Sequence, residues 1–270
     1  MYEIRLNTAR NALRLLIRAY NIKELFIPYY ICPVIRDAII KENAKIKFYH
    51  IDNNFFPDTE AIKSFKKDSF ILYPNYFGIC AKNVYALSSD YKNLIIDNAH
   101  AFFMNQNVGL ASFVSLRKFF NIPDGSILYT KNKLIDELNH DLEIDEDRKV
   151  PQNESEFLLN ESLLNKLDIK LISEQTSTIF DTIKLNNERE KRLENFNKLH
   201  SKLNKSNNLK FTLTKDETPY IYPYLVNEQN VFNTLTQNLL TRYDVLRFWN
   251  NLPKSFLEYK FYKYLMAIKI

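Results

Sequence analysis

The spacing of apolar residues changes several times along the first half of the chain, and each spacing predicts a type of element. Between Thr8 and Tyr20 apolar side chains recur every three or four residues, which predicts an amphipathic helix capped by Asn7 or Thr8. Short apolar runs then alternate with helical patterns. The predicted strands are 24–28, 46–52, 70–75, 94–99, 111–116 and 126–130, and the predicted helices between them are 33–41 and 57–65. This alternation predicts a mostly parallel sheet covered by helices on both faces.

The second half of the chain has longer polar and helical patterns. Residues 139–156 are polar with mixed charges, which predicts a solvated excursion. Residues 163–203 contain almost no helix breaker and carry a rough apolar stripe, which predicts one long connecting helix. Beyond it a small α/β domain is expected, built from 210–214, 220–226, a helix at 228–240 and an aromatic C-terminus. The expected division is a large α/β domain at 1–162, a connecting helix region at 163–205 and a shortened small domain at 206–270.

Composition narrows the class of protein. The net charge is +5 and the charges are spread along the chain without a basic tail, so nucleic-acid binding is not expected. Cys32 and Cys80 give neither a disulfide framework nor the spacing of metal ligands. The N-terminal stretch MYEIRLNTAR has no apolar signal core, and no run reaches the roughly 18 apolar residues of a membrane span. We therefore expect a soluble, cytoplasmic protein without a metal site.

The residues best suited to take part in a reaction lie between Leu94 and Ser126. A buried strand ends at Asp97, His100 follows three residues later, and the next strand leads to Lys118. Each residue alone has an ordinary explanation: a turn aspartate, a hydrogen-bonded core histidine, and half of a solvated basic pair with Arg117. Their order is what favours function, because ligands of open α/β sheets bind outside the carboxyl ends of the strands.

Glycine is scarce in this chain, and its positions support the same segment. The chain has three glycines, Gly78, Gly109 and Gly125. Two of them flank the strand before Lys118, and the third follows the strand at 70–75. In a chain so poor in glycine, these positions predict a backbone with positive φ or a close approach.

Several short motifs together resemble a known family. They are NTARNAL (7–13), PYYICP (28–33), FYHID (48–52), YFG (76–78), DNAHA (97–101), SLRK (115–118) and PDG (123–125). In this order they resemble the DegT/DnrJ/StrS sugar aminotransferases, which are fold-type I enzymes dependent on pyridoxal 5'-phosphate (PLP). The resemblance is in register over residues 1 to about 130 and continues more loosely to Trp249. It implies an aspartate aminotransferase-like α/β fold with a long connecting helix and a small C-terminal α/β domain.

The resemblance implies catalytic roles for three residues. Asp97 is expected to keep the pyridine nitrogen of the cofactor protonated. His100 is expected to pack on the cofactor ring or to bond its 3-oxygen substituent. Lys118 is expected to hold the cofactor covalently and then to act as the general base. A histidine in place of Lys118 would be typical of relatives that dehydrate sugars, so the lysine favours amino transfer.

The resemblance also implies residues that hold the rest of the cofactor. The phosphate is expected at the start of the first helix, where Thr8, Ala9 and Asn11 lie, with Ser115 as a hydroxyl partner. Tyr30 is expected to cover the ring. The alternatives are helix capping for Thr8 and Asn11, and core packing for Tyr30.

The function implied is transfer of an amino group from glutamate or another amino acid to a keto-sugar, with a nucleotide-linked sugar and surface polysaccharide synthesis expected. A homodimer is also implied. Three departures from the family pattern leave the substrate and the activity open more than the binding of the cofactor: Ala9 replaces a glycine, Asp124-Gly125-Ser126 replaces paired glycines, and the chain stops at LMAIKI. Two alternatives therefore stay open. One is a degenerate member that serves as a structural or regulatory partner, and the other is a binding module for acidic glycans.

Overall fold

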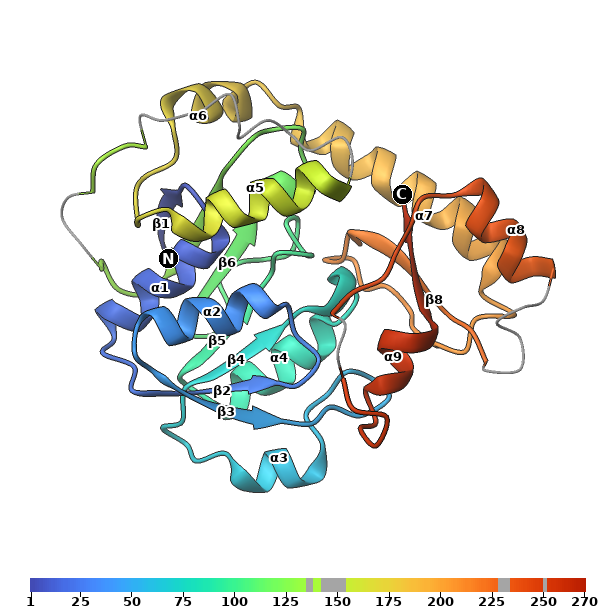
Figure 1. Cartoon of the computed structure of the whole chain (residues 1–270), viewed down its shortest axis with the longest axis horizontal. Helices are drawn as coiled ribbons and strands as arrows, with labels where there is room; N and C mark the ends of the chain where they lie inside the picture. The colour runs from blue at the N-terminus through green and yellow to red at the C-terminus, as the bar shows by residue number, and fades with distance from the viewer. Residues whose placement is uncertain (135–137, 142–153, 228–233, 250–251) are drawn as a thin grey trace.

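The structure is a computed structural model that describes residues 1–134, 138–141, 154–227, 234–249 and 252–270. Its main feature is a seven-stranded sheet of order β1-β7-β6-β5-β4-β2-β3, beside a smaller three-stranded sheet (Figure 1). The strands of the large sheet are β1 (Tyr2–Leu6), β2 (Glu24–Pro28), β3 (Lys45–Tyr49), β4 (Ile71–Pro74), β5 (Leu94–Asp97), β6 (Ala111–Ser115) and β7 (Ser126–Thr130). Strand β7 is antiparallel to both of its neighbours, and the remaining pairs are parallel. The predicted mostly parallel sheet is confirmed.

Helices cover both faces of this sheet because successive side chains of a strand point to opposite faces. Leu72 and Ile95 pack in one core with α1 (Ala9–Ala19) and α2 (Pro33–Lys41). Their neighbours along the strands pack in a second core with α4 (Ala81–Asp90). A short helix, α3 (Thr59–Ser64), joins β3 to β4. The layers that the alternation predicted are therefore present.

The prediction of one long helix over residues 163–203 is wrong. The structure has three helices in this region: α5 (Glu154–Lys166), α6 (Glu174–Asp181) and α7 (Leu185–Leu203). The first break has a tertiary cause, since Leu171 forms bridges to Leu6 and His140 and so holds the backbone extended. Ser173 then caps α6 by accepting a hydrogen bond from the Thr176 N–H. Long-range pairing overrides the local helical pattern.

Two elements of the large domain carry too little periodicity to be predicted. Strand β1 lies at the edge of the sheet and is mostly half-exposed, and α4 mixes apolar with polar residues. The solvated excursion predicted at 139–156 is also only partly right. Asp141 is buried and accepts a hydrogen bond from Asn7 Nδ2 at 3.0 Å. Residues 142–153 of that segment lie outside the described residues.

The small sheet lies to one side of the large sheet and packs against α7 and α8 (Thr234–Arg242) (Figure 1). Its strands are β8 (Ile221–Leu225), β9 (Val245–Leu246) and β10 (Leu265–Lys269). The short helix α9 (Tyr259–Tyr264) lies directly before β10. One face of this sheet contacts Phe196 and Leu199 of α7, and the other joins the core of the large sheet. Residues 210–214 form no strand, and residues 228–233 of the predicted helix lie outside the described part.

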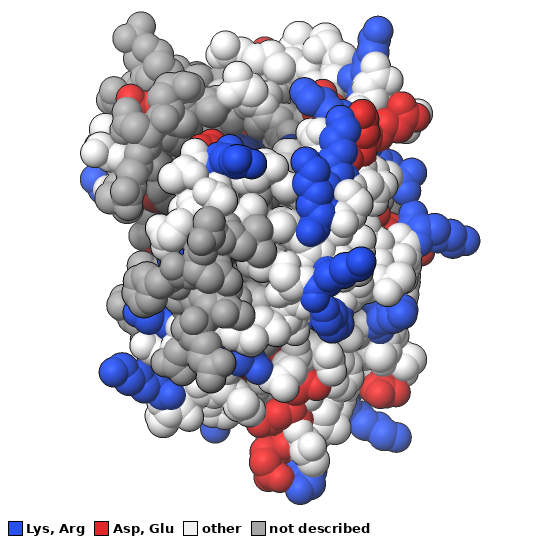
Figure 2. All heavy atoms as spheres, turned by 90° about the vertical axis from the view of Figure 1, so that its right-hand side faces the viewer, with Lys and Arg blue, Asp and Glu red and all other residues white. Residues whose placement is uncertain are grey.

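The charged side chains are dispersed over the surface, as they are along the sequence. On the face seen in Figure 2, lysine and arginine side chains are interspersed with aspartate and glutamate. Among the described residues, no helix is both long and apolar enough to span a bilayer.

The three glycines have positive φ, as their scarcity predicted, and Gly78 allows the closest backbone contact. A Cβ atom at Gly78 would lie 2.4 Å from the carbonyl oxygen of His100, and the φ of Gly78 is +77°.

We predict that Gly78→Ala lowers the free energy of unfolding by at least about 2 kcal/mol, because the backbone strain and the backbone clash add. Urea unfolding measures the change. The control Ser89→Ala, on the exposed side of α4, should stay within about 0.5 kcal/mol of the parent, and equal stability of both variants would contradict the prediction.

Candidate functional site

The candidate site lies at the carboxyl edge of the large sheet, where β5 and β6 are neighbours. Asp97 is the last residue of β5, and Lys118 ends a short 3₁₀ helix, η2 (Leu116–Lys118), that follows β6. The Lys118 Nζ atom lies 2.9 Å from Nε2 of His100. Strand adjacency therefore brings together the three residues that the sequence singled out as catalytic.

His100 is buried and neutral in this setting. Burial, and after it the charge of Lys118, lowers the pKa of His100 well below its ordinary value. A neutral imidazole with the proton on Nδ1 accepts a hydrogen bond from the Lys118 ammonium at Nε2. The rings of Tyr220 and Trp249 stack on the imidazole, with centroid distances of 4.9 and 5.8 Å. The histidine thus holds the lysine in place without adding a second positive charge.

Asp97 presents a carboxylate at the end of β5. Its Oδ1 atom accepts a hydrogen bond from the Ala99 N–H at 2.9 Å. Burial raises the pKa of Asp97, and the charge of Lys118 opposes that rise. Within the described residues Oδ2 makes no hydrogen bond, so this oxygen remains able to accept one from a ligand.

The start of α1 reaches the same edge through β1. Thr8 caps α1, because its hydroxyl oxygen accepts a hydrogen bond from the Asn11 N–H. The first intrahelical bond runs from Ala12 N–H to Thr8 O, so helix geometry leaves the N–H groups of Ala9 and Arg10 without an intrahelical partner.

The turn after Lys118 ties the helix start to the lysine. The Gly125 N–H donates to Asn7 O at 2.7 Å, and the Gly125 carbonyl accepts from Leu116 N–H at 3.0 Å. The φ of Gly125 is +113°, and a Cβ atom there would lie 2.9 Å from Ile172. One glycine therefore sets the position of the α1 N-terminus relative to η2.

The other residues predicted to hold a cofactor have different surroundings. The Asn11 amide donates to Asp168 O at 2.8 Å, so this side chain points to the segment after α5. The hydroxyl of Ser115 makes no hydrogen bond within the described residues. The ring of Tyr30 is fully buried in the aromatic core, and Trp249 contacts both Tyr30 and His100. Binding roles for Thr8, Ala9, Asn11, Tyr30 and Ser115 stay predictions.

Sequence reasoning missed a cluster of charges beside this site. Arg117 is not half of a solvated pair, since 16% of its side chain is exposed and its guanidinium contacts Glu161. Arg10 contacts the same carboxylate. Burial lowers the pKa of Arg117, while Glu161 opposes this effect. Because Glu161 lies far along the chain from Arg10 and Arg117, no local pattern points to this cluster.

Cys32 also lies near the site. It precedes α2, and the charges of Lys118 and Asp97 both act on it, although burial is the main cause of its raised thiol pKa. Its motif was recognised, but no role was expected for the thiol.

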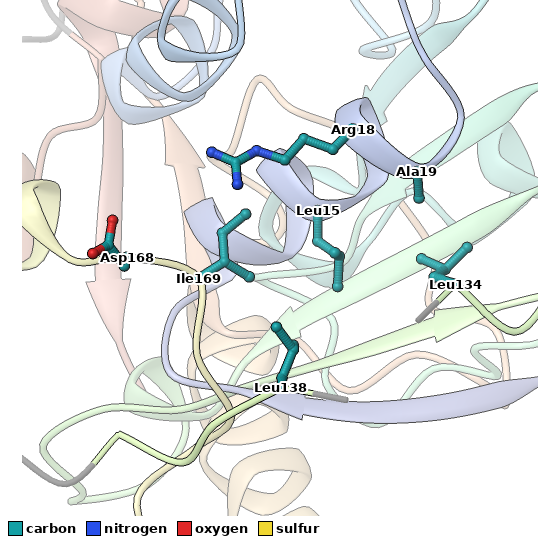
Figure 3. A pocket seen from close by; sticks show the side chains of 7 residues that line it. All are labelled: Leu15, Arg18, Ala19, Leu134, Leu138, Asp168 and Ile169. Atoms are coloured by element: carbon teal, nitrogen blue, oxygen red, sulfur yellow. The ribbon is translucent and has the colours of Figure 1, made fainter. Parts of the chain in front are cut away.

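A cavity of about 400 Å³ lies elsewhere, along the side of α1 (Figure 3). Its lining residues are Leu15, Arg18, Ala19, Leu134, Leu138, Asp168 and Ile169. None of the residues predicted for catalysis lines it. The chemical groups of this protein therefore gather at the sheet edge and not at this cavity.

The neutral state of His100 predicts a dependence of stability on pH. The unfolded chain binds a proton at His100 near pH 6.5, whereas the folded chain does so only at lower pH. The unfolded state therefore binds more protons, and the free energy of unfolding should fall as pH is lowered from about 7.5 to about 5.5, by up to ~1.4 kcal/mol per pH unit for this one group. The measurement is urea unfolding across this range in the parent and in His100→Gln.

Subtracting the two pH profiles removes the groups common to both proteins, including His200 and Asp97. The remaining dependence of the free energy of unfolding on pH is that of His100. Parallel profiles in the parent and the variant would show that His100 is not held neutral by the fold.

Comparison with solved structures identifies the fold. No family model and no curated sequence matches the chain. Among solved structures, an aminotransferase of pseudoaminic acid biosynthesis from Helicobacter pylori superposes with a TM-score of 0.65 at 15% identity, covering 100% of this chain and 81% of that one. NtdA from Bacillus subtilis, with bound cofactor PMP, gives 0.66 at 13% identity, covering 100% and 69%.

A third solved structure carries the family name. A DegT DnrJ EryC1 StrS aminotransferase from Brucella abortus gives a TM-score of 0.62 at 10% identity, covering 100% of this chain and 81% of that one. The similarity thus extends over the whole chain at low identity. This protein has the fold of the DegT/DnrJ/EryC1/StrS aminotransferases, and the fold-type I architecture predicted from the sequence is confirmed.

Proposed function

We propose that this protein is a PLP-dependent aminotransferase that moves an amino group from an amino acid such as glutamate to a keto-sugar. The observation that carries the proposal is the placement of Lys118 Nζ at 2.9 Å from a neutral His100, beside the carboxylate of Asp97. A lysine, a carboxylate and a helix N-terminus at one sheet edge are the groups that a pyridine aldehyde phosphate needs.

The residues present fit this cofactor. The open Oδ2 of Asp97 can accept a hydrogen bond from the pyridine nitrogen, and Lys118 can bond the aldehyde carbon. The free N–H groups of Ala9 and Arg10 can bind the phosphate, with the Ser115 hydroxyl as a further donor. When bound, the cofactor supplies an electron sink for the carbon that loses a proton.

The remaining chemistry belongs to side chains of the protein. The Lys118 amine is placed to take a proton from the reacting carbon and to return it, which is general acid–base catalysis. Neutral His100 accepts a hydrogen bond and so orients Nζ. The aromatic rings around His100 shield the imidazole from water, so the hydrogen bond between His100 and Lys118 is strengthened.

The finer parts of the proposal rest on the family resemblance. We propose a nucleotide-linked sugar, a glutamate donor, a role in surface polysaccharide synthesis, and a cytoplasmic homodimer with the site near the subunit boundary. Residues 1–130, which carry the motifs in register, support the cofactor half of the reaction. For the sugar half, the support is the family resemblance alone.

The proposal predicts a visible absorbance band when the purified protein is mixed with PLP. The band arises from cofactor bonded to Lys118 and should disappear in Lys118→Ala, because the covalent partner is gone. The matched control is Lys92→Ala, which removes an exposed lysine and should leave the band unchanged. A band that survives in Lys118→Ala would refute the assignment of Lys118.

Addition of glutamate to the loaded protein should then shift this band, because transfer of its amino group would remove the bond to Lys118. A stable band that no amino acid shifts would instead favour the alternative of a family member without transaminase activity.

A second prediction uses the single tryptophan of the chain. The indole of Trp249 lies 5.8 Å from the His100 ring and nearly parallel to it, so cofactor bound at Lys118 would lie close enough to accept its excitation energy. We expect PLP to quench the fluorescence of Trp249 in the parent, with much weaker quenching in Lys118→Ala. Free tryptophan at equal absorbance corrects for the light that PLP absorbs in solution. Equal quenching in parent and variant would contradict cofactor binding at this position.

A further inference from the structure

Three buried side-chain amides form a hydrogen-bonded row through the turn that carries Asp97 and His100. They belong to Asn75 after β4, Asn98 after β5 and Gln106 before β6, and each is at most 9% exposed. Asn75 Nδ2 donates to Asn98 Oδ1 at 3.1 Å, and Asn98 Nδ2 donates to Gln106 Oε1 at 2.8 Å. The amide row thus joins the ends of two strands to the segment that leads into a third.

Backbone groups at the two ends of the amide row fix the orientation of its members. At one end Gln106 Nε2 donates to Ala101 O at 3.2 Å and to Met104 O at 2.8 Å, which only the NH₂ side of an amide can do. At the other end Asn75 Oδ1 accepts a hydrogen bond from Cys80 N–H at 3.0 Å. Since donors and acceptors alternate between these ends, turning one amide would place two like atoms together. A fully bonded row of this kind has one arrangement and is rigid.

The amide row holds the turn after β5 at both of its ends. The backbone carbonyl of Asn98 accepts a hydrogen bond from Ala101 N–H at 2.8 Å, which closes the turn. Gln106 then binds the Ala101 carbonyl. His100 lies between Asn98 and Ala101, so the bonds on both sides of it set the direction of its imidazole.

This turn also sets the distance between Lys118 and the two groups beside it. The Asp97 carbonyl accepts a hydrogen bond from Asn75 N–H at 3.0 Å, and His100 Nε2 lies 2.9 Å from Lys118 Nζ. A displacement of the turn would move Asp97 and His100 away from the lysine together. Reacting groups need to be held within roughly 0.5 Å of their working positions, so the contacts that fix this turn bear on the chemistry.

We propose that Asn98 is a positioning residue that holds Asp97 and His100 in place relative to Lys118. Its side chain is the middle member of the amide row, so its loss separates the two ends. The part that Asn98 plays in a reaction rests on the proposed function. The placement of His100 is a property of the protein without cofactor and can be measured there.

The test is ¹⁵N NMR of the histidine side chains in the full-length protein without cofactor, recorded as a function of pH. Signals that disappear in His100→Gln identify the ring. In the parent, His100 should stay neutral down to about pH 5.5, with the proton on Nδ1, because burial and Lys118 hold its pKa low. In Asn98→Ala the turn is loosened and the ring meets water, so the proton affinity of His100 should rise by about tenfold or more.

The surroundings of His100 make this measurement specific to its position. Within the described residues, Lys118 is the charged side chain that acts on the imidazole. The rings that pack on it are those of Phe77, Tyr220, Phe248 and Trp249. Asn98→Ala removes none of these groups, so a changed proton affinity reports a displaced ring.

The alanine variant should still fold, because each neighbour of Asn98 keeps a partner. Asn75 Nδ2 retains the sulfur of Met104, and Gln106 Oε1 retains the hydroxyl of Ser112. Asn98→Ser, which keeps one hydroxyl in the turn, gives the same test with the same expected direction if Asn98→Ala does not fold.

The matched control is Asn207→Ala, which removes an equally buried amide away from the site. Asn207 is 1% exposed, donates to Pro223 O, and accepts from Leu209 N–H and Leu225 N–H. Its loss should lower stability in the same way but should change the proton affinity of His100 by less than about twofold. Equal titration of His100 in the parent and Asn98→Ala, or an equal shift in Asn207→Ala, overturns the proposal.

A titration with PLP tests the part that Asn98 plays in the reaction. The PLP concentration that gives half of the lysine-dependent band should rise by about fivefold or more in Asn98→Ala, since Asp97 and His100 are displaced, and by less than about twofold in Asn207→Ala. Equal PLP affinity in the parent and Asn98→Ala would overturn this part. A parent that forms no lysine-dependent band would overturn the proposed function, whereas the NMR result on His100 would still decide whether Asn98 positions the turn.

Discussion

The contact between the turn at Gly78 and the carbonyl of His100 is the constraint on which the candidate site depends. Phe77 and Gly78 both have positive φ, so the chain turns sharply after β4 and passes directly beside the β5 turn. The same glycine faces the segment before β8, with Thr218 O and Pro219 Cα each 3.3 Å from the position of a Cβ atom. Phe77 O accepts the N–H of Tyr220. Three segments distant in sequence thus meet at one residue without a side chain.

This meeting point explains why the small sheet lies beside the site. Because Tyr220 is bonded to the β4 turn, its ring lies on His100 and near Lys118. The core of the large sheet continues through Phe261 into the inner face of the small sheet, so the two sheets share apolar contacts. A change in that shared core would therefore reach the lysine through Tyr220.

Much of the fold could be predicted because its signals are local. Strands β2 and β7 and helix α2 have the bounds that periodicity and turn residues predict. Asp97, His100 and Lys118 come together because they follow two strands that are neighbours in the sheet. The breaks between α5, α6 and α7 could not be predicted in this way. The break between α5 and α6 depends on Leu171 pairing with Leu6, a contact between residues that are far apart in the sequence. The ion pairs of Glu161 with Arg10 and Arg117 could not be predicted for the same reason, since they also join residues that are far apart in the sequence.

The charges around Lys118 divide the site into two parts with different origins. In the part built from α1, η2 and α5, Arg10 and Arg117 share the carboxylate of Glu161, while Lys118 acts on Asp97 at the end of β5. In the part built from α7 and the start of the small sheet, Arg192 donates to the backbone carbonyls of Phe119 and Tyr220, and Glu188 of the same helix acts on its guanidinium. The two parts meet at Tyr220, whose ring centroid lies 5.9 Å from Lys118 Nζ. The local sequence motifs belong to the first part, whereas the second part exists only once the tertiary fold brings α7 and Tyr220 beside Lys118.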